Sequence, residues 1–394
     1  MKGTKSLWTT IPFLCILFGF SLLNILDGNN SVSGAENRAL TQKPIMGKTN
    51  DLTYSKAYEK YYNDQFVFRD ILLNLNLKWE ILVGKSNLKG YCVVDTVNNS
   101  QWILQNNNLR LTKEKATKYA DTINSYAKNL KNRGIDVYYV STPQKENVLT
   151  HIMPNYSNSP ILLRNKERFE SSLDNKLLTL INIREKFINN FTKTKLEDFY
   201  FKTDNHWNSI GAYEAFKVII DGMNKSLNIK INDNDYNLVK PKGKSIQGIY
   251  ANNLYNLFPQ TEDIPYIYRK NSPNKDYFLY KDSSFKKVNA NEIVGCGLNN
   301  SVLTYPLAYT SSSIHYKTIN HKPLINKKLL IYRDSYHSAM SWILEDIFKE
   351  VEVVDPRYIT KSNTTSLKIS KTTDADIVMF MFNDLGFCNM IDEL

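Results

Sequence analysis

Hydrophobic and polar positions along this chain follow two patterns, one typical of helices and the other of buried strands. Apolar residues recur at three- and four-residue intervals in 52–84, 113–134 and 167–189, which predicts amphipathic helices. Near-continuous apolar runs predict strands that are covered on both faces, at 135–148, 351–359, 374–387 and the start of 327–348. Shorter strands are expected at 91–95 and 101–105. The order helix, Gly134, strand is characteristic of an α/β sheet flanked by helices.

The N-terminal segment has a different character. Residues 7–26 carry no charge and are numerous enough to span a membrane as a helix. Lys2 and Lys5 precede them, which predicts a cytoplasmic N-terminus and an exported body. A cleavable signal peptide is the alternative, with a poor cleavage site in 31–36. We therefore expect an anchor or signal in 1–30 and a polar tether in 31–50.

The remaining residues, 51–394, are expected to form one catalytic domain. Within it, 226–325 is polar, rich in turns and rich in Tyr, which predicts an irregular, β-rich insertion. The apolar content of 42% is sufficient for a substantial core. The net charge of +11 is spread along the chain without an arginine-rich run, so nucleic acid is not an expected partner.

Cysteine usage excludes two further classes of protein. The four cysteines, Cys15, Cys92, Cys296 and Cys388, are widely spaced and match neither a disulfide framework nor a metal site. We expect no metal and no bound cofactor.

Two short stretches carry candidate chemistry. Ser335 follows an apolar strand at a sharp turn into a helix, where catalytic groups of α/β sheets gather. Asp204 and His206 lie two residues apart ahead of another helix, and could supply the base and orienting acid that a serine nucleophile needs. Each also has a structural explanation, because Ser commonly caps helices. His337 is a poor base, since its offset in the turn directs it away from Ser335.

The combination is more specific than its parts. The stretch TDNHWNSIGAYEAF (203–216) resembles the D-x-H-W signature of the DHHW and alginate-acetylation proteins, which are SGNH hydrolase-like. Four other stretches resemble the same family: GAENRALTQKP (34–44), YEKYYNDQFVFRD (58–70), STPQKENV (141–148), and the serine turn with its following strand, IYRDSYHSAMSWIL and VVDPRY (331–344 and 353–358).

This resemblance implies an SGNH hydrolase-like fold, with Ser335 as nucleophile, His206 as general base and acid, and Asp204 as the orienting carboxylate. It also implies O-acetylation of a cell-surface exopolysaccharide by an exported, membrane-anchored protein. The acetyl donor would be a multi-spanning membrane acyltransferase. The serine turn reads Arg-Asp-Ser rather than the Gly-Asp-Ser of ordinary SGNH enzymes. The candidate oxyanion donors are the Ser335 N–H and the Asn383 side chain.

Three further residues are candidates for binding substrate: Trp207 beside the base, and Lys145 and Arg357 at expected strand ends. Core packing for Trp207 and a plain surface position for Lys145 are the alternatives. Two rival functions also remain open at this stage. One is an O-acetyl esterase with the same triad, which differs only in using water as acceptor, and the other is a non-catalytic polysaccharide-binding scaffold.

Overall fold

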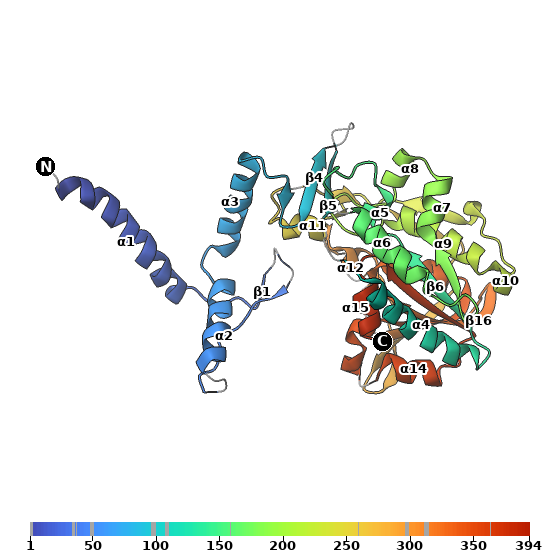
Figure 1. Ribbon diagram of the computed structural model, residues 1–394. Helices are drawn as coiled ribbons and strands as arrows, with labels where there is room; N and C mark the ends of the chain where they lie inside the picture. The colour runs from blue at the N-terminus through green and yellow to red at the C-terminus, as the bar shows by residue number, and fades with distance from the viewer. Residues whose placement is uncertain are drawn as a thin grey trace. The chain divides into compact units, whose positions relative to one another are not determined.

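The computed structural model describes residues 3–33, 36, 38–47, 51–95, 100–106, 110–157, 159–258, 260–295, 299–310, 315–362 and 364–394 (Figure 1). The chain divides into two compact units. The smaller contains Met1–Lys89 and Ala251–Pro259, and the larger contains Gly90–Tyr250 and Gln260–Leu394. This division falls later than the expected boundary at residue 50, because residues 51–89 cluster with the N-terminal segment. Cys296 lies outside the described residues.

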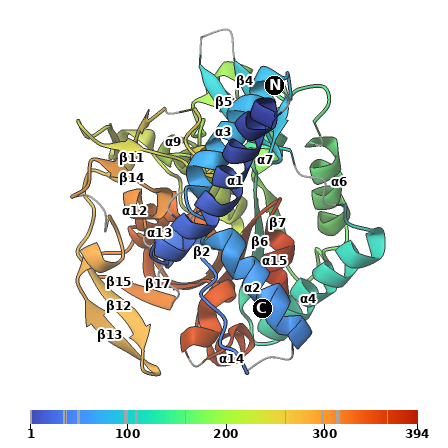
Figure 2. The same cartoon turned by 90° about the vertical axis from the view of Figure 1, so that its left-hand side faces the viewer.

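The larger unit is built on an eight-stranded sheet. The strands from β17 to β7 are parallel, and β15, β12 and β13 extend one edge with antiparallel pairing (Figure 2). In spatial order the strands are β13 (Ser284–Val288), β12 (Lys275–Lys281), β15 (His315–Asn320), β17 (Phe348–Val354), β16 (Ile325–Arg333), β18 (Ile377–Asn383), β6 (Asp136–Thr142) and β7 (Thr179–Asn182).

Both faces of this sheet are covered, as the apolar runs predict. In β18, Ile377, Met379 and Met381 belong to one core cluster, while the alternate residues, Val378 and Phe380 among them, belong to the other. The first cluster includes residues of α7 (Ile183–Asn190), α9 (Ser209–Gly222) and α13 (Ser341–Glu345). The second includes residues of α4 (Lys113–Lys131), α6 (Ser159–Glu170), α14 (Ser366–Thr372) and α15 (Phe387–Asp392).

The segment 226–325 is less separate than the sequence suggests. Its strands β12, β13 and β15 belong to the main sheet. Its remaining strands form two small sheets. One pairs β8 (Tyr236–Val239) with β11 (Tyr266–Arg269), and the other contains β9 (Ser245–Ile246), β10 (Glu262–Asp263) and β14 (Val302–Leu303). The short helices α10 (Asn224–Leu227), α11 (Ile249–Asn253) and α12 (Tyr305–Ala308) lie between α9 and β15 in the chain. Outside this segment, β4 (Tyr91–Asp95) pairs with β5 (Gln101–Gln105), and α5 (Lys145–Val148) and α8 (Lys193–Glu197) complete the unit.

One helix prediction was wrong in its extent. The helix predicted over 167–189 is the end of α6, then β7, then α7. The reason is that Leu180 and Ile181 pair in register with Tyr139 and Val140 of β6, and this pairing overrides helical periodicity. The segment 52–84 is mostly helical, as predicted. It forms α2 (Asp51–Asp64) and α3 (Arg69–Leu82), which are separated where Phe68 adopts a left-handed conformation with φ of 59°.

The smaller unit begins with α1 (Gly3–Leu26), which is long and apolar enough over Trp8–Leu26 to cross a membrane. A signal sequence would meet the same test, so α1 is either a membrane anchor or a signal. The unit also contains the strand pair β1 (Val32–Ser33) and β2 (Arg38–Ala39), the helices α2 and α3, and β3 (Asn87–Leu88).

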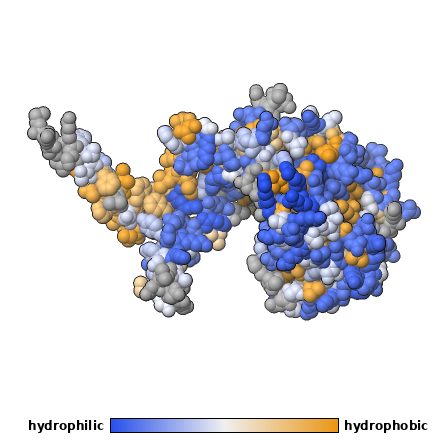
Figure 3. All heavy atoms as spheres, viewed as in Figure 1, coloured by the Kyte–Doolittle hydropathy of each residue, from blue (hydrophilic) through white to orange (hydrophobic). Residues whose placement is uncertain are grey.

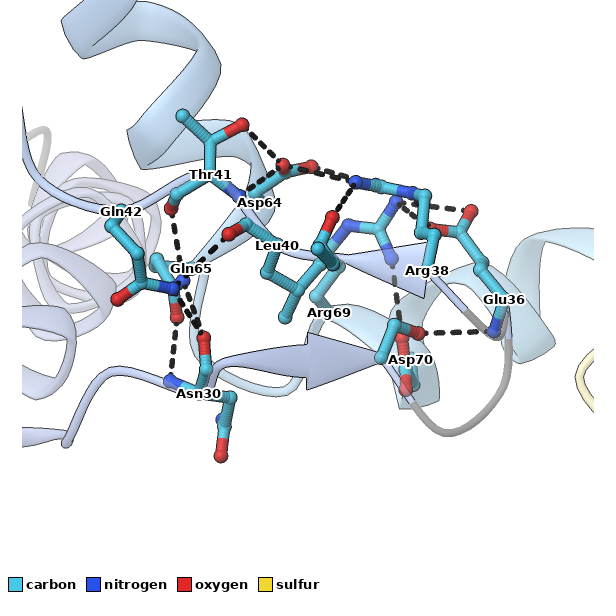
Figure 4. A network of polar contacts seen from close by, with 12 residues as sticks. Asn30, Glu36, Arg38, Leu40, Thr41, Gln42, Asp64, Gln65, Arg69 and Asp70 are labelled. Carbon is cyan, nitrogen blue, oxygen red and sulfur yellow. Dashed lines mark hydrogen bonds and ion pairs between the residues drawn. The ribbon is translucent and has the colours of Figure 1, made fainter. Parts of the chain in front are cut away.

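The described part of the predicted tether is held in place by polar contacts. Arg38 donates two hydrogen bonds to the buried Asp64 at the end of α2, with N–O distances of 3.0 and 2.7 Å. Thr41 donates two more to the same carboxylate, from its backbone and its hydroxyl. Glu36 forms ion pairs with Arg38 and with Arg69 at the start of α3. Figure 4 shows how this network fastens the strand pair to the α2–α3 junction.

Candidate active site

Ser335 follows the carboxyl end of β16, a central strand, and so lies on the side of the sheet where its parallel strands end. Asp334 caps the following 3-10 turn, Ser335–Ala339, by accepting a hydrogen bond from Tyr336 N at 2.9 Å. The same carboxylate accepts from the backbone and side-chain nitrogens of Asn383, at the end of β18. Burial raises the pKa of Asp334. These bonds join the ends of two adjacent strands and fix the turn that carries the half-buried Ser335.

The loop before α9 places an acid against a histidine. Asp204 Oδ1 lies 2.6 Å from His206 Nδ1 and accepts from His206 N, while its Oδ2 accepts from Ile249 N. Burial alone would raise the pKa of Asp204, but the His206 imidazole and the hydrogen bonds outweigh it and hold the pKa below its usual value. An ionised Asp204 therefore fixes Nδ1 of the neutral ring as the protonated nitrogen, which leaves Nε2 free to accept a proton.

His206 connects this acid to the serine, 129 residues away in the chain. Its Nε2 lies 2.6 Å from Ser335 Oγ. Its ring stacks on that of Tyr305, with centroids 3.8 Å apart and planes 9° from parallel. Asp204, His206 and Ser335 thus form an uninterrupted hydrogen-bond chain, and the stack restricts the imidazole to the orientation that maintains it.

The Asp204–His206 loop is held from both sides by buried or half-buried charges. The Lys145 ammonium donates to the carbonyls of Phe201 and Lys202, at 3.1 and 3.0 Å. The Glu262 carboxylate accepts from the backbone N–H groups of Lys202 and Thr203, at 2.7 and 2.9 Å. A cation on the carbonyl side and an anion on the amide side leave this backbone little freedom to move.

Gly248 allows the same loop to pack closely against its neighbour. A Cβ atom at Gly248 would lie 2.1 Å from the Thr203 carbonyl oxygen and 2.4 Å from Asp204 N. Any larger residue would therefore displace the backbone that carries Asp204.

Comparison with protein families identifies the group to which this arrangement belongs. A family model described as the SGNH hydrolase-like domain of the acetyltransferase AlgX matches residues 96–301, just over half of the chain. The chain belongs to this family. The matched range includes Asp204 and His206, whereas Ser335 follows it. A comparison with curated protein sequences finds no match.

Solved structures with the same fold include members of the group anticipated from the sequence. Bacillus cereus PatB1 has a TM-score of 0.61 and 21% identity, covering 75% of this chain and 97% of that one; it has also been solved with a sulfonyl adduct. A DHHW family protein from Eubacterium siraeum has a TM-score of 0.54 and 16% identity, covering 77% and 95% of the two chains. The predicted fold and family resemblance are confirmed, and at these identities the structural likeness concerns the fold.

Two predicted substrate contacts in this AlgX-family chain were wrong. Trp207 is fully buried, donates from its indole nitrogen to Tyr336 O, and packs edge-on against the Tyr336 ring, so it anchors the core rather than stacking on a sugar. Lys145 is also fully buried, neither on the surface nor within reach of a substrate, because its charge is used inside the protein. Burial lowers the pKa of Lys145 to about 8, against the opposing effects of Glu146, Glu262 and Asp204.

The Arg357 side chain lies in a small group of charges at the end of β17. Its Nε and one terminal nitrogen donate to Asp355, at 2.9 and 2.7 Å, and Asp355 also pairs with the buried Arg333. Arg333 thus occupies the position of the usual glycine with its side chain directed into an ion pair. Substrate binding by Arg357 remains a prediction, with its half-exposed guanidinium already shared with Asp355.

The oxyanion candidates differ in how they are engaged. Asn383 donates from its amide to Asp334 at 2.8 Å, and its carbonyl oxygen accepts from the N–H groups of Leu385 and Gly386. Only one of the two protons on the Asn383 amide nitrogen is used in this way, and the second could be donated to another acceptor. For the Ser335 N–H, no hydrogen-bond partner is found among the described residues. Of the two candidates, the Ser335 N–H is therefore the one without another hydrogen-bond partner among the described residues.

Sequence reasoning missed Tyr305 and Glu262. Both come from the segment taken for an irregular insertion, and neither has a motif or spacing that points to His206. Only the folded chain shows that one stacks on the imidazole and the other binds the loop that carries it. His337 behaves as the sequence suggests: it is fully buried, neither ring nitrogen has a hydrogen-bond partner among the described residues, and burial lowers its pKa to about 3.

Proposed function

We propose that this protein is an exported, membrane-anchored O-acetyltransferase that modifies a cell-surface polysaccharide through an acetyl-Ser335 intermediate. The observation that carries the proposal is the hydrogen-bond chain from Asp204 through His206 to Ser335, with both links at 2.6 Å. Membership of the AlgX acetyltransferase family supports the choice of acetyl as the transferred group. The sulfonyl adduct of PatB1 supports the use of sulfonyl reagents as probes of this chain.

In the first half-reaction, Ser335 Oγ attacks the carbonyl carbon of an acetyl donor while its proton passes to His206 Nε2. Negative charge on the tetrahedral oxygen is stabilised by the Ser335 N–H, with Asn383 as a second donor. Collapse breaks the bond to the leaving group, which takes the proton from His206. Asp204 stabilises the imidazolium while it exists. The product is an acetyl ester on Ser335.

In the second half-reaction, a sugar hydroxyl takes the place of the leaving group. His206 accepts its proton as the hydroxyl oxygen attacks the acetyl carbon, and the bond to Ser335 Oγ breaks as Oγ is reprotonated. Water in the same position would release acetate, which is the esterase alternative. We propose a polysaccharide as acceptor and a multi-spanning membrane acyltransferase as donor, consistent with α1 as an anchor beside that donor.

A matched pair of variants in one turn tests the proposal. Full-length protein in detergent is given a chromogenic acetyl ester, and turnover is compared for wild type, Ser335→Ala and Ser338→Ala. Ser338 is buried in the same turn and controls for local perturbation. We expect turnover to disappear in the first variant and to persist in the second.

The acceptor is identified in the same assay by adding oligosaccharides. If acetylated sugar forms and less free acetate is released, the result supports transfer. If only acetate is released with every acceptor tested, the result supports hydrolysis. Turnover by Ser335→Ala equal to that of wild type would overturn the catalytic proposal.

A further inference from the structure

The α3 helix of the smaller unit exposes a continuous apolar stripe. Its members within α3 recur at three- and four-residue spacing, so they share one face of the helix, and the N-cap residue Phe68 adds an exposed side chain at its start. Single exposed apolar residues are ordinary, but a contiguous stripe marks a surface that contacts something apolar. The exposed fractions are 52% for Phe68, 59% for Ile71, 37% for Leu72, 54% for Leu75, 63% for Trp79 and 77% for Leu82. Figure 3 shows hydrophobic residues gathered along α1 and on α3.

The opposite face of α3 already makes contacts within the chain. Leu77 is 2% exposed, and Asn74 donates from its amide to the Tyr255 carbonyl at 3.0 Å. The exposed stripe is therefore the outer face, and rotating the helix to bury it would expose Leu77 and break this hydrogen bond.

The start of α3 is fixed against the end of the apolar α1 helix. Val67 N donates to the Asn24 side chain at 2.8 Å, and the rings of Phe20 and Phe66 stack with centroids 5.7 Å apart. Asn24 lies in the last turn of α1, where a spanning helix would leave the hydrocarbon. The ion pair between Arg69 and Glu36, at 3.1 Å, adds a second restraint at the same junction.

We propose that α3 lies on the outer surface of the lipid bilayer, with its apolar stripe in the zone between headgroups and acyl chains. The inference rests on α1 being retained as the anchor of the proposed function. The two aromatic residues of the stripe, Phe68 and Trp79, suit the membrane interface. The helix carries Arg69 and Lys78 against Asp70 and Glu80, so apolar burial rather than attraction to anionic lipid provides the contact.

The position of Trp79 allows a direct test with lipids brominated near the glycerol end of their acyl chains, which quench tryptophans at that depth. Full-length protein is reconstituted into vesicles of neutral phosphatidylcholine. Trp8→Phe reports Trp79, Trp79→Phe reports Trp8 in the anchor, and the double variant gives the background of the remaining tryptophans. In the brominated lipids, we expect the tryptophan emission of the Trp8→Phe protein to fall by more than that of the double variant.

A second pair of variants separates membrane contact from helix stability. In the Trp8→Phe protein, Leu75→Gln changes the stripe, and Asn76→Gln changes an exposed polar neighbour. The first should reduce the quenching of Trp79 and the second should leave it unchanged. Quenching of Trp8 without quenching of Trp79 would overturn the proposal, and so would equal quenching in the two Gln variants. Acetyl-ester turnover measured on the same samples reports on the catalytic proposal independently.

Discussion

At the residue scale, the proposed nucleophile Ser335 is surrounded by groups from three separate segments. Asp204 and His206 come from one loop, Ser335 from a strand end, and Tyr305 from a short helix. A serine hydroxyl is a weak nucleophile by itself, so its reactivity depends on a base held in one orientation. The 2.6 Å contacts and the ring stack supply that orientation.

The role of Asp204 predicts the behaviour of an isosteric variant. In Asp204→Asn the charge that stabilises the imidazolium is lost and the preferred tautomer changes, so the rate constant should fall by about 10³–10⁴-fold. The fall should appear in kcat for an acetyl ester with little change in KM. Asp198→Asn, an exposed acid near the same loop, is the control. A decrease below about tenfold in Asp204→Asn would contradict the assignment.

Lys145 predicts an alkaline limit on activity that is not caused by unfolding. Its folded pKa of about 8 lies below that of an exposed lysine. The unfolded chain therefore binds more protons between about pH 8 and about pH 10, and the stability contributed by this group rises with pH across that window. Loss of its charge weakens its hold on the Phe201 and Lys202 carbonyls, so activity should fall over the same window.

The measurement is a pair of profiles against pH for wild type and Lys145→Met. Wild type should lose turnover above about pH 8 while its thermal midpoint does not decrease as a result of this group. The variant should be slower at neutral pH and lack that alkaline limb. An identical limb in both proteins would show that another group titrates.

The proximity of Asp204, His206 and Ser335 could be predicted because short motifs carry these residues. The roles of Lys145 and Trp207 could not, since both side chains are fully buried by segments distant in sequence. Strand ends and aromatic neighbours of a base are statistical signs of substrate contact, but burial decides whether a side chain reaches solvent.

At the element scale, the sheet is arranged so that the candidate site residues meet at the carboxyl ends of its parallel strands. β6, β16 and β18 are parallel neighbours, so their carboxyl ends bring the Lys145 segment, Ser335 and Asn383 to the same side. The close passage of Gly248 past the Thr203 backbone completes the support of the acid loop.

That close passage gives a prediction for Gly248→Ala. The added methyl group would lie 2.1 Å from the Thr203 carbonyl oxygen, so the loop must shift and Asp204 with it. We expect acetyl-ester turnover to fall at least as far as in Asp204→Asn, with a destabilisation of about 1–3 kcal/mol. Gly28→Ala, where a Cβ meets nothing within 4 Å, should change neither. Normal turnover in Gly248→Ala would show that the loop tolerates displacement.

Element type was predictable wherever the apolar pattern was strong, as in β16 and β18. It failed in 167–189, where helical spacing coexists with a strand that pairs with β6. The segment 52–84 is mostly helical, as predicted, but the left-handed Phe68 that separates its two helices was not foreseen. Pairing partners and backbone breaks depend on tertiary contacts that a local window does not contain.

At the scale of the whole molecule, the chain consists of a larger unit, which contains Asp204, His206 and Ser335, and a smaller unit that carries α1. The sequence predicted the apolar span and a following tether. It did not predict that Arg38, Thr41 and Asp64 would bond the described part of the tether to α2. Those contacts join residues more than twenty positions apart, and the residues are polar types that are common on any protein surface.

The charged network of the smaller unit predicts a sensitivity to acid. The hydrogen bond from Arg38 lowers the pKa of Asp64, with burial opposing. Burial would raise the pKa of Glu36, but hydrogen bonds from Tyr255 and Arg69 lower it to about 2. Both folded values lie below the unfolded ones, so the stability they contribute is present above about pH 5 and is lost as the pH falls toward about 2.

Arg38→Met tests this dependence. Removing the guanidinium should lower the thermal midpoint of the full-length protein near neutral pH and reduce the further loss on acidification. The readout is thermal unfolding by circular dichroism at several pH values. Parallel curves for wild type and variant, displaced by a constant amount, would contradict the proposed linkage.

The central claim, that Ser335 carries the acetyl group, is tested most directly by locating that group on the chain. Full-length protein is mixed with an activated acetyl ester, quenched in acid and digested, and the modified peptide is sequenced by mass spectrometry. The account predicts an acetyl ester on Ser335 that is absent from Ser335→Ala, is removed by a sugar acceptor, and forms far more slowly in Asp204→Asn. Acetylation confined to lysines, with Ser335 unmodified while the protein turns over substrate, would contradict it.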